Sequence, residues 1–292
     1  MKIGIVGLGK MGLGFTQRLL NAGYTVYGYD TQLQSQNFFA AQGGKAVPLD
    51  ELPTHTHIII VLVPAGTAVS DVIEALKKHA HHHTVIIDAG NSHFSDSVKH
   101  YEELRKSAIQ FLDCGTSGGI LGAETGYSLT IGGDKKTFTL CKPVFAALAQ
   151  ENGYVHVGPA GAGHYVKMVH NSIEYGLLEA YAEGFNLLKH GDYKDLNLSE
   201  IAHIWNQGAI ISSQLLALSE YALMEKNLEK TSGIVAETET VRWSIENAQK
   251  HAISIPVIKD ALQVRLESQK GSVSFATKYI SLMRHLFGGH KL

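Results

Sequence analysis

The sequence predicts an α/β domain built on a doubly wound sheet, followed by an all-helical domain. Two observations support this prediction. Short apolar runs alternate with helical patterns in the first half, and the second half reads almost entirely as helices. The length of 292 residues suits one large domain or two of ordinary size. Because the character of the chain changes at the glycine-rich segment 158–163, we expect domains of residues 1–160 and 161–292.

Seven apolar runs predict the strands of the sheet. They are Ile3–Val6, Thr25–Tyr29, Ile58–Val63, Val85–Asp88, Ile109–Asp113, Tyr127–Ile131 and Tyr154–Val157. The first five read as buried parallel strands, and the last two are expected to extend the same sheet. Helical patterns fill the intervals, at Lys10–Ala22, Ala68–His79 and Ser95–Ser107 and then up to about Ala149. A longer pattern without an interior proline, His164–Lys189, predicts one unusually long helix.

The composition is that of a well-buried globular protein, with 45% hydrophobic and 18% charged residues. A formal net charge of −2 without a basic stripe argues against nucleic acid as a partner, so an anionic substrate must be held by a few placed cations. Cys114 and Cys141 are the only cysteines, which is typical of a reducing compartment. Neither a signal peptide nor an apolar run of membrane-spanning length is visible, so we expect a cytoplasmic protein without membrane contact.

A glycine-rich turn follows the first predicted strand and opens a helix. Its residues are Gly7-Leu8-Gly9-Lys10-Met11-Gly12. In this context GxGxxG is the dinucleotide-binding signature of a Rossmann domain. Gly7 allows the tight turn, Gly9 lets backbone amides approach a pyrophosphate, and Gly12 permits close packing of helix on strand. A glycine turn without a ligand is the alternative, and three further features argue against it.

The three features follow later strands and belong to the same edge of the predicted sheet. Asp30 ends the second strand, where a carboxylate takes the ribose hydroxyls and would repel a 2′-phosphate. We therefore favour NAD as the cofactor over NADP. The loop Val63-Pro64-Ala65-Gly66 leaves the next predicted strand, and Asp88-Ala89-Gly90-Asn91-Ser92 leaves the one after it. Asn91 is placed to serve the nicotinamide or the substrate, with a simple turn asparagine as the alternative.

Two later segments are candidates for the chemistry. Ser117-Gly118-Gly119 follows a predicted strand, and its hydroxyl and exposed amides suit a carboxylate, although a plain tight turn fits equally well. The second segment lies on the long helix. Residues at i, i+3, i+4 and i+7 share one helix face, and these are Lys167, His170, Asn171 and Glu174, with Tyr175 on the flank. A solvated face is the ordinary reading of such a stripe, but its apolar neighbours and the preceding glycine-rich junction favour a site at the domain interface.

On these residues the sequence resembles the 6-phosphogluconate dehydrogenases in their short form, within the β-hydroxyacid dehydrogenase superfamily. The family pattern of lysine, methionine, valine, histidine, asparagine, any residue, isoleucine, glutamate and tyrosine is matched by residues 167–175 without a gap. Ser117-Gly118-Gly119 matches the family's substrate turn, and Asn91-Ser92 its asparagine–serine pair. The match runs from Met1 to the end. Two departures are the missing second helical repeat of the long form and Gln207, which stands where the long form usually has lysine.

The resemblance implies oxidative decarboxylation of 6-phospho-D-gluconate to D-ribulose 5-phosphate, CO2 and NAD(P)H, a reaction of the pentose phosphate pathway. In the family the lysine is the general base on the C3 hydroxyl and, once protonated, stabilises the enolate oxygen. That role carries over to Lys167, whose pKa must be lowered for it. Glu174 matches the acid that protonates C1 of the enediol. His170 and Asn171 would orient the substrate's hydroxyls and carboxylate, and no metal is expected.

The resemblance also implies a phosphate site. Tyr175 matches a phosphate-contacting tyrosine, Arg242 sits where the long form has a phosphate-binding lysine, and Arg265 matches the phosphate arginine. Near the end of the chain, Arg284 and His290 match an element that reaches into a neighbouring subunit's site. This implies a homodimer or homotetramer in which the tail completes the neighbour's site. For each residue taken alone, a surface charge or a flexible terminus is the alternative.

Two other functions compete with this reading. A β-hydroxyacid dehydrogenase of the 3-hydroxyisobutyrate type would share the fold and the lysine, but its substrate would leave Arg242, Arg265 and Arg284 unpaired. A non-catalytic NAD(P)-binding sensor would keep the glycine loop and Asp30 but would have no need for Lys167 and Glu174 on one helix face.

Overall fold

The computed structural model confirms an α/β fold with an all-helical second part, and it describes residues 1–229 and 231–292. The chain divides into two compact units, Met1–Lys167 and Met168–Leu292. Helix α8 (Ala162–His190) runs through this division. Among the described helices, none is both long enough and apolar enough to span a bilayer.

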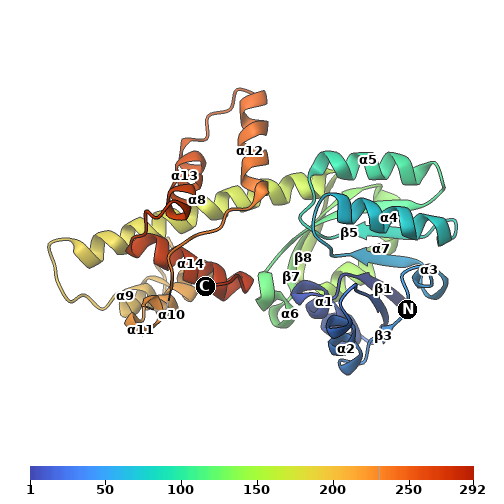
Figure 1. Cartoon of the computed structure of the whole chain (residues 1–292), viewed down its shortest axis with the longest axis horizontal. Helices are drawn as coiled ribbons and strands as arrows, with labels where there is room; N and C mark the ends of the chain where they lie inside the picture. The colour runs from blue at the N-terminus through green and yellow to red at the C-terminus, as the bar shows by residue number, and fades with distance from the viewer. Residues whose placement is uncertain (230) are drawn as a thin grey trace. The chain divides into compact units, whose positions relative to one another are not determined.

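The first unit is built on one eight-stranded sheet (Figure 1). Its strands are β1 (Lys2–Val6), β2 (Thr25–Tyr29), β3 (Lys45–Ala46), β4 (Ile58–Val61), β5 (Val85–Asp88), β6 (Gln110–Ser117), β7 (Tyr127–Gly133) and β8 (Ala149–Gly158). Their order is β3-β2-β1-β4-β5-β6-β7-β8, and every neighbouring pair is parallel except β6 with β7. The connection 118–126 is too short for a crossover that would return the chain in parallel, so β7 runs back along β6.

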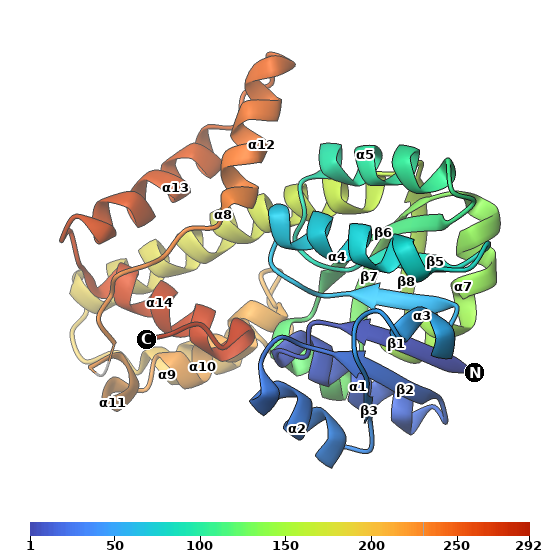
Figure 2. The same ribbon diagram turned by 45° about the vertical axis from the view of Figure 1, so that its right-hand side comes forward.

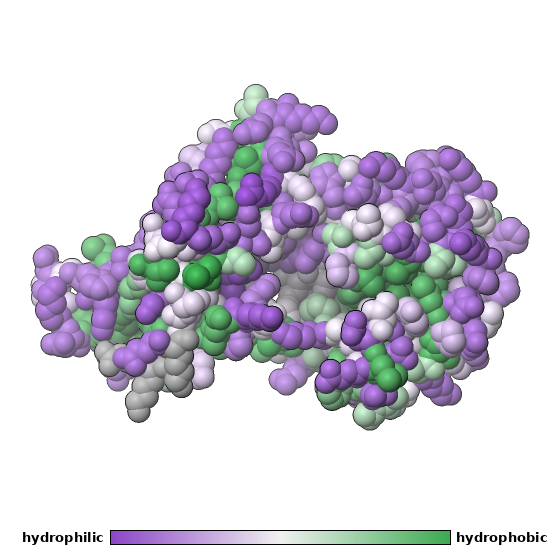
Figure 3. Space-filling model, in the orientation of Figure 1, coloured by the Kyte–Doolittle hydropathy of each residue, from purple (hydrophilic) through white to green (hydrophobic). Residues whose placement is uncertain are grey.

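Helices cover both faces of this sheet (Figure 2). One face carries α1 (Lys10–Asn21), α2 (Leu33–Ala41) and α7 (Lys135–Leu148), with the short helices η1 (Gly119–Leu121) and α6 (Gly122–Thr125) beside α1. The other carries α3 (Leu52–His55), α4 (Thr67–His79) and α5 (Phe94–Arg105). Figure 3 shows hydrophilic residues over the outer surface of α5, as expected for a helix that buries only one side.

Alternating side chains of the central strands supply the two cores. Ile58 and Ile60 of β4 join the core that contains Phe15 of α1, while Ile59 and Val61 join the core on the opposite face. Successive strand residues point to opposite faces, so a strand covered on both sides reads as a continuous apolar run. Each such fully buried aliphatic side chain stabilises the fold by about 1.5–3 kcal/mol. The apolar runs therefore predicted these strands correctly.

The described residues of the second unit form helices and connecting loops, without a strand. Besides α8 it contains α9 (Leu198–Trp205), α10 (Gln214–Ala222), α11 (Glu225–Leu228), α12 (Glu239–Lys250), α13 (Pro256–Gln269) and α14 (Phe275–Gly288). The 29 residues of α8 give a helix about 44 Å long. Its main core joins α8 to α9, α10 and α14, through residues such as Phe185, Leu216 and Tyr279. A smaller core of Tyr175, Val241, Ala261 and Leu262 joins α8 to α12 and α13.

Candidate active site

The glycine turn between β1 and α1 has the geometry of a phosphate cradle. Gly7 adopts a positive φ of 93°, and a Cβ there would lie 2.5 Å from the Leu62 carbonyl oxygen. A Cβ on Gly12 would collide with the carbonyl oxygen of Gly7, so the helix approaches the strand closely. Above Gly9 there is open space, and no side chain caps α1 at this residue. The N-terminus of α1 therefore faces open space above Gly9, the arrangement in which helix N-termini bind anions.

Asp30 is fixed against this turn. Its carboxylate accepts a hydrogen bond from the Leu8 amide at 2.7 Å and another from the Gln32 amide at 2.8 Å. A carboxylate offers about four lone-pair positions, so two remain for ribose hydroxyls. The residues present at β1, α1 and β2 thus fit a dinucleotide.

The next two loops also leave the carboxyl edge of the sheet, after the neighbouring strands β4 and β5. Pro64 is exposed, and Val63 and Ala65 are half-buried. After β5 the Asp88 carboxylate accepts hydrogen bonds from the Gly90 amide at 3.1 Å and the Ser92 hydroxyl at 2.6 Å. These bonds fix the loop and leave Asn91 exposed beside it.

The predicted substrate turn follows β6. Gly118 and Gly119 have φ values of 124° and 55°, which side chains with a Cβ rarely tolerate. Ser117 is the last residue of β6 and is half-buried. The conformation of this turn therefore requires its glycines.

Lys167 is held in place by the anchored first turns of α8. The buried Asp113 carboxylate accepts hydrogen bonds from the Gly161 amide at 2.7 Å and the His164 amide at 2.9 Å. A negative side chain at a helix N-terminus is favourable for both the amides and the helix dipole. Gly115 leaves just enough room for the Lys167 side chain, since a Cβ on Gly115 would lie 2.5 Å from the Lys167 Cβ. In the sequence Asp113 is only the last residue of a predicted strand, which gives no sign of this anchoring role.

In the second unit, α12 packs along the part of α8 that carries the polar stripe. Asn171 donates a hydrogen bond to the Thr240 hydroxyl at 3.3 Å, and the buried Ser172 donates one to Ser244 at 2.7 Å. His170 is exposed, with its Nδ1 3.3 Å from the Asn171 side-chain oxygen. Lys167 and Glu174 lie on the same helix, seven residues and about 10 Å apart along its axis.

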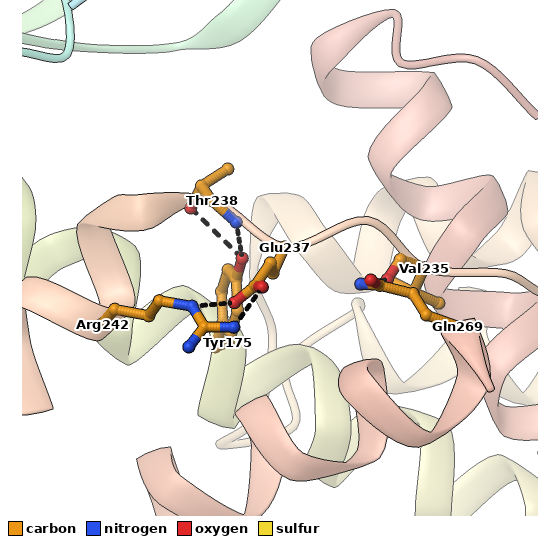
Figure 4. Close-up of polar contacts among 6 residues, drawn as sticks. All are labelled: Tyr175, Val235, Glu237, Thr238, Arg242 and Gln269. Carbon is orange, nitrogen blue, oxygen red and sulfur yellow. Dashed lines mark hydrogen bonds and ion pairs between the residues drawn. The ribbon is translucent and has the colours of Figure 1, made fainter. Parts of the chain in front are cut away.

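Tyr175 is fixed by the segment that precedes α12. Its hydroxyl accepts a hydrogen bond from the Thr238 amide at 2.8 Å and lies 3.2 Å from the Thr238 hydroxyl (Figure 4). The same segment is tied to α13, because Gln269 donates to the Val235 carbonyl at 3.0 Å. The tyrosine ring is therefore held in a fixed position between α12 and α13, which we call the Tyr175 platform.

Arg265 lies on this platform. Its guanidinium carbon is 3.2 Å from the centre of the Tyr175 ring, and the residue is 1% exposed. Among the described residues, its Nε and one terminal nitrogen have no hydrogen-bond partner. Burial lowers the pKa of Arg265 to about 10 against the opposing effects of Tyr175 and Glu174. A buried cation with unused donors is suited to a charged ligand.

Arg284 of α14 joins the same cluster. It is 6% exposed, and burial lowers its pKa while nearby Tyr175 and Glu174 oppose that shift. The resemblance implies that this arginine acts in a neighbouring subunit. Within its own chain it is near enough to Glu174 and Tyr175 for both to act on its pKa, because α14 packs on α8 through the main core. Its action on a neighbour stays a prediction.

Two other predicted substrate-binding residues are exposed, in contrast to Arg265 and Arg284. Arg242 forms an ion pair with Glu237, its Nε 2.7 Å from the carboxylate, and 49% of its side chain is exposed (Figure 4). The hydrogen bonds that Arg242 donates to the Glu237 carboxylate raise the pKa of Arg242. His290 follows α14 and is exposed, with its carbonyl oxygen 2.7 Å from Nδ1 of His285. Their roles in substrate binding stay predictions.

Glu179 is a member of the arginine cluster that the sequence reasoning missed. It lies one turn beyond Tyr175 on α8 and is 7% exposed. Burial and the nearby Glu183 raise its pKa to about 7, although Arg265 acts in the opposite direction. The only signal in the sequence was its position four residues after Tyr175, on the same side of the helix.

Family comparisons match both parts of the chain. Residues 2–158 match the NAD binding domain of 6-phosphogluconate dehydrogenase, and residues 163–280 match the 6-phosphogluconate dehydrogenase C-terminal domain. An NAD(+)-dependent, decarboxylating 6-phosphogluconate dehydrogenase of Haloferax volcanii is 38% identical, over 100% of this chain and 98% of the relative.

Solved structures agree with these matches. The 6-phosphogluconate dehydrogenase of Plasmodium falciparum, described with its cofactor NADP+ and its substrate 6-phosphogluconate, is 27% identical with a TM-score of 0.86. The match covers 93% of this chain and 62% of that longer one. A 3-hydroxyisobutyrate dehydrogenase from Salmonella typhimurium shares the fold, at 20% identity and a TM-score of 0.79, over 96% of this chain and 99% of that one. With both family matches and the full-length relative in agreement, the chain belongs to the 6-phosphogluconate dehydrogenase family.

Proposed function

We propose that the protein is an NAD(P)-dependent oxidoreductase that converts 6-phospho-D-gluconate into D-ribulose 5-phosphate and CO2. The observation that carries this proposal is the buried cluster around Tyr175, in which Arg265 and Arg284 lie next to Glu174 on α8. A buried guanidinium with unused donors destabilises the fold unless a ligand accepts hydrogen bonds from those donors. A substrate with an anionic group at one end would do so.

The phosphate end of the substrate is assigned to this cluster. Arg265 offers Nε and a terminal nitrogen on one side of its planar fork, the arrangement that binds two phosphate oxygens together. The guanidinium lies over the ring of Tyr175, which supports it on that side. Arg242 contributes less to the proposed site because its charge is already neutralised by Glu237 in water-exposed surroundings.

Lys167 is assigned the proton transfers at C3. With a nicotinamide held in the cofactor site to supply the hydride acceptor, Lys167 would remove the proton of the C3 hydroxyl. In its protonated form it then stabilises the negative oxygen that develops as the carboxylate leaves. Glu174 donates the proton to C1 of the resulting enediol. His170, Asn171 and the turn Ser117-Gly118-Gly119 orient the hydroxyls and the carboxylate of the substrate.

NAD is the proposed preferred cofactor, with NADP as the alternative. The Asp30 carboxylate is fixed by Leu8 and Gln32 at the end of β2, where it would accept from ribose hydroxyls and repel a 2′-phosphate. The segment 31–34 supplies no arginine to offset this repulsion. The glycine turn, Lys10 and Met11 at the start of α1 and the loops with Val63–Ala65 and Asn91 complete the proposed cofactor site.

Two alternatives predict different behaviour. A dehydrogenase for a small unphosphorylated acid, such as 3-hydroxyisobutyrate, would have no use for the buried Arg265 and Arg284. A non-catalytic sensor would bind the dinucleotide without turnover. A homodimer or homotetramer with tail exchange also belongs to the proposal, although Arg284 already reaches the cluster within one chain.

An absorbance assay of reduced cofactor tests the proposal directly. It is run with 6-phosphogluconate, gluconate and 3-hydroxyisobutyrate, each with NAD and with NADP. Rapid reduction with 6-phosphogluconate and much slower reduction with the other two acids supports the proposal. Preference for 3-hydroxyisobutyrate would select the first alternative. Tight dinucleotide binding without reduction by any of the three would select the second.

A further inference from the structure

Glu179 is buried next to the arginines, and nothing in the proposed reaction uses it. The residue is 7% exposed, and its Oε2 has no hydrogen-bond partner among the described residues. Arg265, on α13, is 1% exposed, and two of its nitrogens likewise have no hydrogen-bond partner among the described residues. The acceptor Oε2 of Glu179 and the two donor nitrogens of Arg265 are therefore buried near enough for the two charges to interact. No hydrogen bond joins these atoms.

Such an arrangement is unfavourable in the absence of a ligand, since unpaired buried polar atoms cost stability. We propose that Glu179 is a specificity-determining partner of Arg265, which takes up a proton from solvent as the phosphate end of the substrate enters the cluster. The neutral carboxylic acid no longer competes with the phosphate for the guanidinium, and its O–H is able to donate to a phosphate oxygen. This inference rests on the proposed phosphate site.

The charges around Glu179 favour this proton uptake. Glu183 and Glu174 on α8 are negative, and Arg265 on α13 and Arg284 on α14 are positive, with Tyr175 between α8 and Arg265. Burial and Glu183 already raise the pKa of Glu179 to about 7. A phosphate dianion on Arg265 would add negative charge and offset the effect of Arg265, which lowers the pKa of Glu179. Ligand binding therefore raises the pKa further, and affinity falls as the pH rises through about 7.

The first test compares the pH dependence of KM for 6-phosphogluconate in the wild type and Glu179→Gln. If only the protonated form binds, KM of the wild type rises roughly 25-fold between pH 6.5 and 8.5 relative to the variant. The substrate's own phosphate titrates identically for both proteins, so the ratio isolates Glu179. Glu183→Gln is the matched control, because Glu183 is exposed and lies one turn further along α8. In this variant the KM profile should keep the inflection due to Glu179, shifted to a lower pH because Glu183 no longer raises the pKa of Glu179. Parallel profiles for the wild type and Glu179→Gln would overturn the proposal.

A second test needs no variant. Calorimetric titration of the wild type at pH 7.5, in buffers of different ionisation enthalpy, should show uptake of roughly 0.8 proton per 6-phosphogluconate bound. Gluconate should show none. No uptake with 6-phosphogluconate would overturn the role of Glu179 even if the enzyme turns it over. Conversely, proton-linked binding of 6-phosphogluconate without turnover would support Glu179 and contradict the proposed reaction, so the two failures are distinguishable.

Discussion

Gly115 controls the position of the proposed base, and its replacement by alanine gives a quantitative prediction. A Cβ at Gly115 would lie 2.5 Å from the Lys167 Cβ and 2.6 Å from both the Gly163 carbonyl oxygen and the Thr130 hydroxyl. Ordinary contacts begin at 3.4 Å, so α8 must move away from β6 by about 1 Å. Two of the three obstacles belong to the first turns of α8, which Asp113 anchors from the same strand.

A displacement of about 1 Å in a catalytic group typically reduces the rate by about 100-fold, which corresponds to about 2.7 kcal/mol in the activation free energy. For Gly115→Ala we therefore expect kcat with 6-phosphogluconate to fall by about that factor. The Kd of NAD should change little, since the glycine turn and Asp30 are not in contact with Gly115. Steady-state kinetics and calorimetric titration of NAD measure the two quantities.

The matched control is Gly184→Ala on the same helix, where a Cβ meets nothing within 4 Å. This change should leave kcat unaltered and raise the free energy of unfolding by roughly 0.5–1 kcal/mol, because glycine is a poor helix former. Circular dichroism of both variants is the check that they fold. A folded Gly115→Ala protein with kcat within twofold of the wild type would refute the claim that β6 sets the position of Lys167.

Three further predictions concern the charged residues of the site. Lys167→Ala should reduce kcat by at least about 100-fold while the Kd of NAD stays within about twofold. Unchanged turnover in a stopped-flow assay would show that Lys167 is not the general base. Arg265→Ala should raise KM for 6-phosphogluconate by roughly 100-fold and leave KM for gluconate unchanged. Arg242→Ala should change either KM by less than about threefold. Equal effects of the two substitutions would contradict the assignment of the buried arginine to the phosphate. Asp30→Ala should lower the ratio of kcat/KM for NAD to that for NADP by about tenfold or more; an unchanged ratio would show that Asp30 does not select the cofactor.

The sequence predicted the elements whose pattern depends on local burial. The strands β1, β2 and β5 and the helix α8 were predicted almost to the residue, because strands buried on both faces and a long amphipathic helix each leave a clear period. Strand β3 has two residues, both exposed, and so leaves no apolar run. The strand β8 begins directly after α7, at Ala149, well before the predicted run 154–157. The apolar pattern missed this part of the strand because residues 150–153 are polar or glycine.

The site was harder to predict where burial depends on distant segments. Arg242 and Arg265 look alike in the sequence, each a single arginine in a helical pattern. Only the packing of α13 and α14 on α8 buries Arg265, while Arg242 stays exposed beside Glu237. For the same reason Glu179 resembled an ordinary solvated glutamate. The spacing of Lys167, Asn171 and Glu174 required no such information, since residues at helical intervals share a face in any context.

The most direct measurement follows the carboxyl carbon of the substrate. With 6-phosphogluconate labelled with ¹³C at C1, the protein and NAD should release one labelled CO2 for each cofactor molecule reduced, and ribulose 5-phosphate should accumulate in the same amount. Reduced cofactor without labelled CO2 would contradict the proposed decarboxylation, and no reduction at all would contradict the proposed enzyme.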